Sequence, residues 1–205
     1  MKNRFPLLFG TAALLLAATP ACTDRPEVEP QPATDLAQPG PAFSLQRSFY
    51  YPATSVSSAI GYAPAELYGT ALQSGDVLSF SFQQLHNPQQ DMLTFSLDRR
   101  PLPAALVGTY SLRSTAVPGG QVGVRYAFTG RAGSDAWGRT YATDFTALEG
   151  TFTVSSYDAD RRLIGGSYRL LVPDAADPLN PALDDQGKAR CRITVEGTFA
   201  NLPVR

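Results

Sequence analysis

The strongest constraint on the fold is a two-residue alternation of apolar and polar side chains, which is clearest near the C-terminus. One side of this last segment carries Cys191, Ile193, Val195 and Phe199, and the other carries Arg192, Thr194, Glu196 and Thr198. Successive side chains of a β-strand point to opposite faces, so the pattern predicts a strand with one buried face.

Further segments alternate in the same way. They cover residues 43–51, 78–82, 93–97, 122–128 and 164–172. No window of helical length has a 3.6-residue period, and only a single helical turn is expected, near residues 63–66. The chain is 43% hydrophobic and 17% charged, which is the composition of a globular domain.

Turn-forming residues separate the predicted strands. They occur at residues 86–91, 118–120 and 157–160, where Gly, Pro, Asn and Asp concentrate. Short strands joined by such turns predict a single antiparallel β-sandwich of about 8–10 strands, with a small β-barrel as the alternative. Two segments, 130–140 and 173–187, are expected to be longer insertions.

A short motif of glycine, then serine or threonine, then an aromatic residue recurs along the chain. The copies are Gly108-Thr109-Tyr110, Gly150-Thr151-Phe152, Gly166-Ser167-Tyr168 and Gly197-Thr198-Phe199. Their uneven spacing argues against a solenoid repeat. A glycine in a strand leaves room for an aromatic ring from a neighbouring strand to lie over it. The motif therefore predicts packing of the sheets, in preference to a ligand site.

The N-terminal residues predict export. Lys2 and Arg4 precede the apolar run 7–18, which is too short to cross a bilayer, since a spanning helix needs about 20 residues. Residues 1–21 are therefore expected to be a signal peptide. Ala21-Cys22 resembles the end of a bacterial lipoprotein signal, although Thr19 and Pro20 depart from its usual pattern. The resemblance implies cleavage before Cys22 and lipid on its thiol.

The alternative for this segment is ordinary cleavage after Ala21, with Cys22 left as a free thiol. The chain has one other cysteine, Cys191, which an acylated Cys22 could not pair with. We expect Cys191 to be buried and inert, and a disulfide between the two is the less favoured reading. Residues 22–42, rich in proline, are expected to form a linker, and residues 43–205 the β domain.

The order of motifs in the last sixty residues is similar to that of uncharacterised β-rich lipoproteins from Bacteroidetes. The segments that carry the resemblance are Leu148-Glu149-Gly150-Thr151-Phe152, Ser156-Tyr157-Asp158, Leu163-Ile164-Gly165-Gly166-Ser167-Tyr168 and Glu196-Gly197-Thr198-Phe199-Ala200-Asn201-Leu202-Pro203. The resemblance implies a lipid-anchored β domain with no established activity. It carries over no catalytic residue. We expect the protein to lie in the cell envelope, at the outer membrane.

Few residues suggest chemistry. His86, the only histidine, falls in a predicted turn and is expected to be solvated. The Asp158/Asp160 pair lacks the remaining ligands of a calcium loop, and a plain turn is favoured. A loop stabilised by calcium through Asp174, Asp177, Asp184 and Asp185 is a weaker alternative. No motif predicts a catalytic group, a metal or a cofactor.

Aromatic residues provide the candidate ligand contacts. Trp137 and Tyr141 could stack on a sugar or a partner ring, or could instead close the end of the β core, and Tyr50 and Tyr51 pose the same choice. The net charge of −1 and the absence of a basic stripe argue against a nucleic-acid partner.

Three functions follow, in order of preference. The first is a non-catalytic, membrane-anchored binding or scaffolding domain with an unknown glycan or protein ligand. The second is a carbohydrate-capture module. The third is a hydrolase that uses two carboxylates.

Overall fold

The computed structural model describes residues 39–84, 89–132, 134–180, 187 and 189–205. The expected signal peptide, Cys22, most of the linker and His86 lie outside these residues. The strands are β1 (Ala42–Tyr51), β2 (Val56–Gly61), β3 (Leu67–Ser74), β4 (Val77–Gln84), β5 (Gln89–Asp98), β6 (Gly108–Ser111), β7 (Val122–Ala132), β8 (Asp135–Ala142), β9 (Glu149–Asp158), β10 (Leu163–Ala176) and β11 (Arg190–Pro203). The expected helical turn is present as a 3-10 helix, η1 (Pro64–Glu66).

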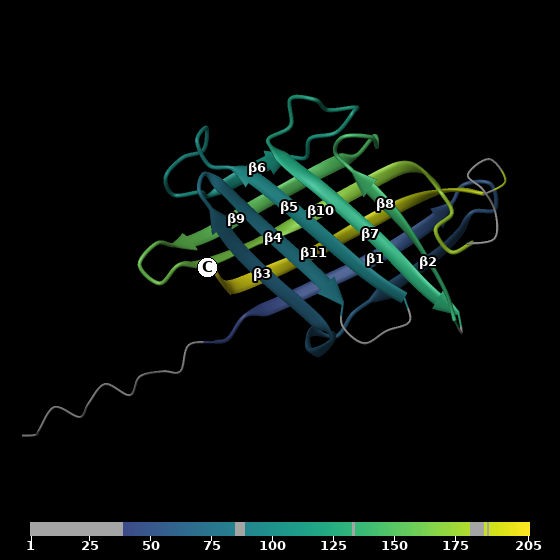
Figure 1. Cartoon of the computed structure of the whole chain (residues 1–205), viewed down its shortest axis with the longest axis horizontal. Helices are drawn as coiled ribbons and strands as arrows, with labels where there is room; N and C mark the ends of the chain where they lie inside the picture. The colour runs from purple at the N-terminus through teal and green to yellow at the C-terminus, as the bar shows by residue number, and fades with distance from the viewer. Residues whose placement is uncertain (1–38, 85–88, 133, 181–186, 188) are drawn as a thin grey trace, which may run out of the picture. The chain divides into compact units, whose positions relative to one another are not determined.

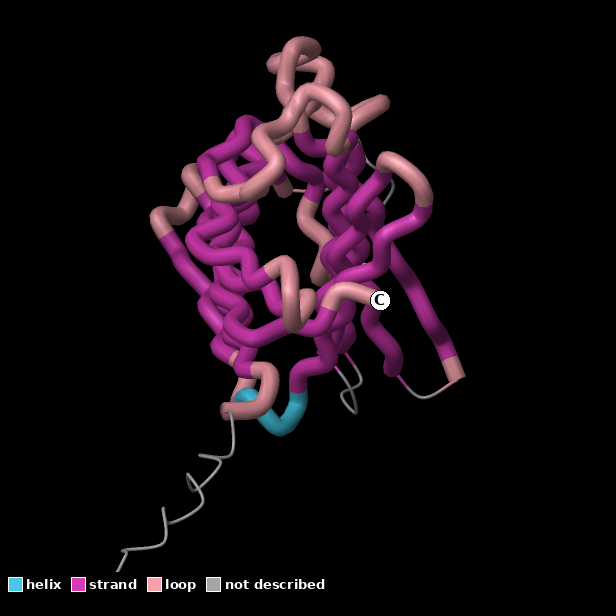
Figure 2. Tube along the Cα trace, turned by 90° about the vertical axis from the view of Figure 1, so that its left-hand side faces the viewer, coloured by secondary structure: helices cyan, strands magenta, loops and turns pink. Residues whose placement is uncertain are grey.

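The strands form two antiparallel sheets that face each other (Figures 1 and 2). One sheet has the order β2-β1-β11-β10-β9-β6, and the other has the order β3-β4-β5-β7-β8. The sheets do not close into a barrel, so the predicted β-sandwich is confirmed and the barrel alternative is wrong. The eleven strands described exceed the 8–10 expected.

Phenylalanine rings fill the space between the sheets. Phe80 and Phe95 of the second sheet pack on Phe152 of the first, with ring centroids 4.7 and 4.8 Å apart. All three side chains are fully buried. Such rings combine a large buried apolar area with favourable edge and offset contacts, so they dominate the energetics of a core. The alternation found in the sequence places Phe80 and Phe95 on an inner face.

The insertion predicted for residues 130–140 is wrong. Residues 130–132 complete β7 and residues 135–140 form most of β8, and Gly130 pairs with Trp137 across the hairpin. Strand β8 is the edge of its sheet, with Asp135 and Gly138 exposed, so it lacks the apolar alternation that identifies a central strand. The second expected insertion begins later than predicted, because β10 continues to Ala176.

Two of the four glycine motifs contain the predicted contact between a glycine and an aromatic ring on the neighbouring strand. Gly166 lies opposite Phe199, and Gly197 lies opposite Tyr168. A Cβ atom on Gly197 would lie 2.5 Å from the Tyr168 hydroxyl oxygen and 2.0 Å from the Ser44 carbonyl oxygen. The Tyr168 side chain crosses β11 above this glycine and donates a hydrogen bond to Ser44.

In the part of the chain that the structure describes, no helix has the length and hydropathy of a membrane span.

Candidate functional site

A polar cluster lies within the apolar core. It consists of Arg47, Tyr62, Asp91 and Tyr126, and is called the Asp91 cluster below. Arg47 occupies an inward position of β1 between Leu45 and Phe49 and is 5% exposed. Asp91 occupies an inward position of β5 and is fully buried. The two strands belong to different sheets, so the cluster joins the layers of the sandwich.

Hydrogen bonds and charge hold the Asp91 cluster together. The hydroxyl groups of Tyr62 and Tyr126 donate to the two carboxylate oxygens of Asp91, the second at 2.5 Å. The Arg47 Nη1 atom lies 3.5 Å from Asp91 Oδ2. The same guanidinium lies over the rings of Phe49 and Phe128, 4.4 and 4.8 Å from their centroids.

The environment of the Asp91 cluster indicates a structural role. Burial, together with the neighbouring Asp91 carboxylate, raises the pKa of both Tyr62 and Tyr126, so both stay protonated donors at neutral pH. Within the described residues, Arg47 Nη1 has no hydrogen-bond acceptor, although it lies within ion-pair distance of Asp91. The buried charge of Arg47 is costly to remove from water, and the negative charge of Asp91 is needed to offset that cost.

Trp137 and Tyr141, the predicted ligand contacts, both form hydrogen bonds to other residues of the domain. Trp137 packs over Gly130, and its indole N–H donates to the Pro178 carbonyl oxygen at 3.1 Å. Tyr141 is buried, stacks on Tyr126 and donates to the Ala176 carbonyl oxygen at 3.2 Å. Both side chains therefore tie β8 to the end of β10 in the other sheet, which matches the alternative that they close one end of the core.

Tyr51, the remaining inward aromatic candidate, forms a hydrogen bond to residue 177, between the acceptors of Tyr141 and Trp137. Its hydroxyl group donates to Asp177 Oδ1 at 2.8 Å. Tyr50 lies within cation–π distance of Arg192, 5.9 Å from ring centroid to guanidinium carbon.

The remaining polar candidates have local partners. Asp158 accepts hydrogen bonds from the Arg161 backbone N–H and side chain, as expected of a turn. Asp174 pairs with Arg190 at 2.7 Å, whereas Asp184 and Asp185 lie outside the described residues. Among the residues that the structure describes, no three metal-ligating side chains gather. Cys191 is buried as predicted, and burial raises the pKa of its thiol to about 12.

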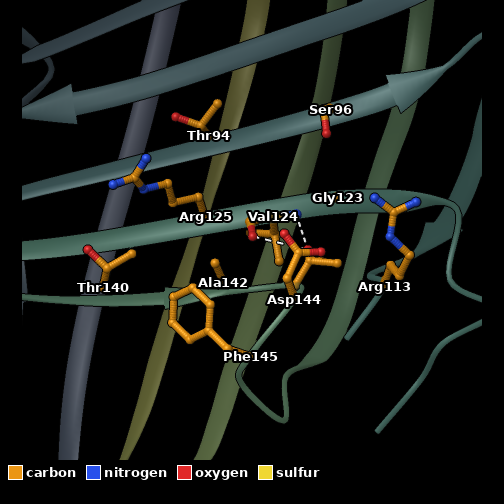
Figure 3. A pocket seen from close by; sticks show the side chains of 11 residues that line it. Thr94, Ser96, Arg113, Gly123, Val124, Arg125, Thr140, Ala142, Asp144 and Phe145 are labelled. Atoms are coloured by element: carbon orange, nitrogen blue, oxygen red, sulfur yellow. Dashed lines mark hydrogen bonds between the residues drawn. The ribbon is translucent and has the colours of Figure 1, made fainter. Parts of the chain in front are cut away.

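An open groove lined by polar, charged and aromatic side chains lies on the outer face of the second sheet (Figure 3). It crosses β5, β7 and β8 and has a volume of about 470 Å³. The lining residues are Thr94, Ser96, Arg113, Gly123, Val124, Arg125, Thr140, Ala142, Thr143, Asp144 and Phe145. This surface is called the outer groove below.

Two arginines and an exposed aromatic ring give the outer groove its character. Arg113 and Arg125 present their guanidinium groups at separate places along it (Figure 3). Within the described residues neither guanidinium forms an ion pair. Phe145 is 66% exposed, the largest exposed fraction among the large apolar side chains described. Groups of this kind can bind an anion and an apolar ring face.

Local geometry explains how the groove forms. A Cβ atom on Gly123 would lie 2.5 Å from Ser96 Oγ and 3.3 Å from Arg113 Nη2, so this glycine makes space for both side chains. Thr143 accepts a hydrogen bond from Val124 N–H and returns one to its carbonyl oxygen. These bonds fix the start of the turn that presents Asp144 and Phe145.

Sequence reasoning missed both the Asp91 cluster and the outer groove. Arg47 and Asp91 lie at the alternate positions of their strands that apolar residues otherwise occupy. This pattern could have identified them as buried. Arg125 alternates with Val124 and Tyr126 and could have been placed on the outer face. No sequence pattern indicated that Arg125 lies near Arg113 or Phe145, because only the order of the strands in the sheet brings these three residues to one groove.

Comparisons with protein-family models, with curated proteins and with solved structures found no match. The resemblance to β-rich lipoproteins from Bacteroidetes therefore stays a prediction from the motifs.

Proposed function

We propose that this chain is an exported lipoprotein, anchored in the cell envelope through Cys22, whose β-sandwich binds an acidic carbohydrate in the outer groove without chemical conversion. The observation that carries the binding role is the pair of arginines, Arg113 and Arg125, that line one groove without an ion-pair partner among the described residues. The anchor rests on the sequence around Cys22.

The charge of the groove favours an acidic ligand. A guanidinium group is planar and can donate two parallel hydrogen bonds to a carboxylate or sulfate group. Asp144 is the one carboxylate among the described lining residues, against two arginines. The groove is therefore positive on a chain whose net charge is −1, which favours an anionic ligand at this place.

The exposed ring of Phe145 favours a carbohydrate over a simple anion. The apolar face of a sugar ring packs on aromatic side chains, and the hydroxyl groups of Thr94, Ser96 and Thr140 line the same groove. The carbohydrate hypothesis drawn from the sequence thus moves from Trp137 and Tyr141 to Phe145. The hydrolase alternative gains no support here, because paired carboxylates would be needed.

The linker would give the domain reach. A polyproline helix rises by about 3.1 Å per residue, so a linker with the proline-rich composition of residues 23–41 would allow roughly 60 Å between membrane and domain. The mature lipoprotein would carry more than one acyl chain, which makes anchoring stable. A ligand-binding domain on such a tether can reach polymers that lie away from the membrane surface.

Binding of polygalacturonate by the mature full-length protein in detergent tests this proposal. We expect Arg113→Ala and Arg125→Ala each to weaken binding by about tenfold or more, because a hydrogen bond to a charged group contributes about 1.5–3 kcal/mol. Phe145→Ala should also weaken it. Isothermal titration calorimetry at low and high salt would measure these losses, and added salt should weaken binding by the wild-type protein.

Arg169→Ala is the matched control, because this exposed arginine lies on the other sheet and pairs with Glu196 at 3.8 Å. It should leave affinity unchanged. Neutral dextran should bind less well than polygalacturonate. Equal affinity of wild-type and the two groove variants, or no response to any acidic polysaccharide, would refute the groove as the ligand site.

A further inference from the structure

The four edge strands of the sandwich differ in how they are protected from pairing with another chain. The edges are β2 and β6 in one sheet and β3 and β8 in the other. Strand β6 has only four residues, and β8 carries Asp135 and Arg139. Strand β3 is covered in part by the C-terminus, because Arg205 N–H donates to the Ala71 carbonyl oxygen and Gln73 N–H donates to the Arg205 carbonyl oxygen. Short length, charge and coverage are the usual protections of an edge.

Among the described residues, no segment bonds to the free edge of strand β2, and the strand itself is neither charged nor as short as β6. Its sequence, Val-Ser-Ser-Ala-Ile-Gly, contains no charged residue and no proline, and its register with β1 is continuous. Five of its six residues are exposed, and Val56 is 54% exposed. An uncharged edge that is six residues long is a template for a further antiparallel strand.

The direction of the backbone groups on β2 follows from its pairing. Tyr62 N–H donates to the Leu45 carbonyl oxygen, so Tyr62 and, by alternation, Ile60, Ser58 and Val56 bond toward β1. The N–H and C=O groups of Ser57, Ala59 and Gly61 therefore point away from the sheet. An added strand would bond to these residues.

We propose that β2 pairs with β2 of a second copy of this chain, in an antiparallel dimer about a two-fold axis at Ser58. In this register Ser57 exchanges hydrogen bonds with Ala59 of the second copy, as the outward direction of both residues requires. Val56 faces Ile60 of the second copy, and Ser58 faces its own equivalent. Apolar side chains meet and no like charges are opposed.

A second copy is the partner that this strand fits best. A two-fold axis makes the interface self-complementary and closes it at two subunits. Val56, Ser58 and Ile60 lie on the inner face of the sheet, where Ile60 already packs against the core. The dimer would extend that core from Ile60 onto Val56 of the partner copy and join two six-stranded sheets. This inference depends on neither the lipid anchor nor the ligand of the outer groove.

A cysteine at the axis tests the proposal in the mature full-length protein. Residues directly opposite in a pair without hydrogen bonds have Cα atoms about 4.5 Å apart, which suits a disulfide. Under mild oxidation, Ser58→Cys should therefore give a reducible dimer on non-reducing gels. On the same denaturing gels the wild-type protein and Leu72→Cys, which places a thiol at a position 54% exposed on β3, should run as single chains, because neither forms a covalent cross-link.

Disruption of the strand edge provides the second arm. Ala59→Pro removes an outward N–H but no bond to β1, and it should abolish cross-linking of Ser58→Cys while circular dichroism shows an unchanged fold. Ser58→Lys opposes two charges at the axis, and light scattering in detergent should show a monomer where the wild-type protein is a dimer. A monomeric wild-type protein, or no more dimer from Ser58→Cys than from Leu72→Cys, would overturn the proposal.

Discussion

Replacing Asp91 with asparagine should lower the free energy of unfolding by about 3–5 kcal/mol, because it leaves Arg47 as a buried charge without its counter-charge. Both side chains are nearly inaccessible, at 0% and 5% exposed. The change also weakens two hydrogen bonds, since Tyr62 and Tyr126 both donate to this carboxylate. Asparagine has nearly the same volume, so the loss would come from charge and hydrogen bonding, with little contribution from packing.

Urea denaturation followed by circular dichroism would measure this effect as a lower midpoint at an unchanged slope. Asp144→Asn, at an exposed carboxylate of the outer groove, should change stability by less than about 0.5 kcal/mol. The double variant Arg47→Met/Asp91→Asn should be more stable than Asp91→Asn alone, because it removes the buried charge that has lost its partner and keeps an amide oxygen as an acceptor for the tyrosines. A loss below about 1 kcal/mol for Asp91→Asn would contradict the structural role of the Asp91 cluster.

Replacing Gly197 with alanine should destabilise the domain by about 1–3 kcal/mol, as overpacking of a filled core does. The added methyl group would lie 2.0 Å from the Ser44 carbonyl oxygen and 2.5 Å from the Tyr168 hydroxyl oxygen. Tyr168 would have to leave its position across β11 and give up its hydrogen bond to Ser44. The pairing of β1 with β11 would be disturbed at the same place.

Thermal unfolding would show this loss as a lower melting temperature. Gly119→Ala is the matched control, because a Cβ atom there meets nothing within 4 Å. Adding Tyr168→Phe to Gly197→Ala should restore part of the stability. It removes the hydroxyl oxygen, which is the Tyr168 atom closest to the new methyl group. Equal melting temperatures for Gly197→Ala and Gly119→Ala would show that Gly197 is not required for packing.

The alternation of side chains predicted every central strand except β9, because burial on one face leaves a direct record in the sequence. Strands β1, β4, β5, β7, β10 and β11 all contain a segment recognised in this way. Edge strands leave a weaker record. Strand β2 is exposed on nearly every residue, and β8 combines glycine with charged residues, so neither needs an apolar face.

The buried polar residues show where the pattern fails. Arg47 lies at a core position of β1. A charged side chain there interrupts the apolar alternation and argues against a buried strand unless its counter-charge is known. That counter-charge, Asp91, lies on a strand of the other sheet. The outer groove depends in the same way on the order β5-β7-β8, which no local pattern in the sequence specifies.

The central claim, a β domain displayed on a lipid anchor, depends on the fate of Cys22. Mass spectrometry of the protein purified from the membrane fraction would determine its N-terminus. We predict a chain that begins at Cys22 and carries diacylglycerol on the Sγ atom and an acyl chain on the amino group. A soluble chain that begins at an unmodified Cys22 would contradict the claim.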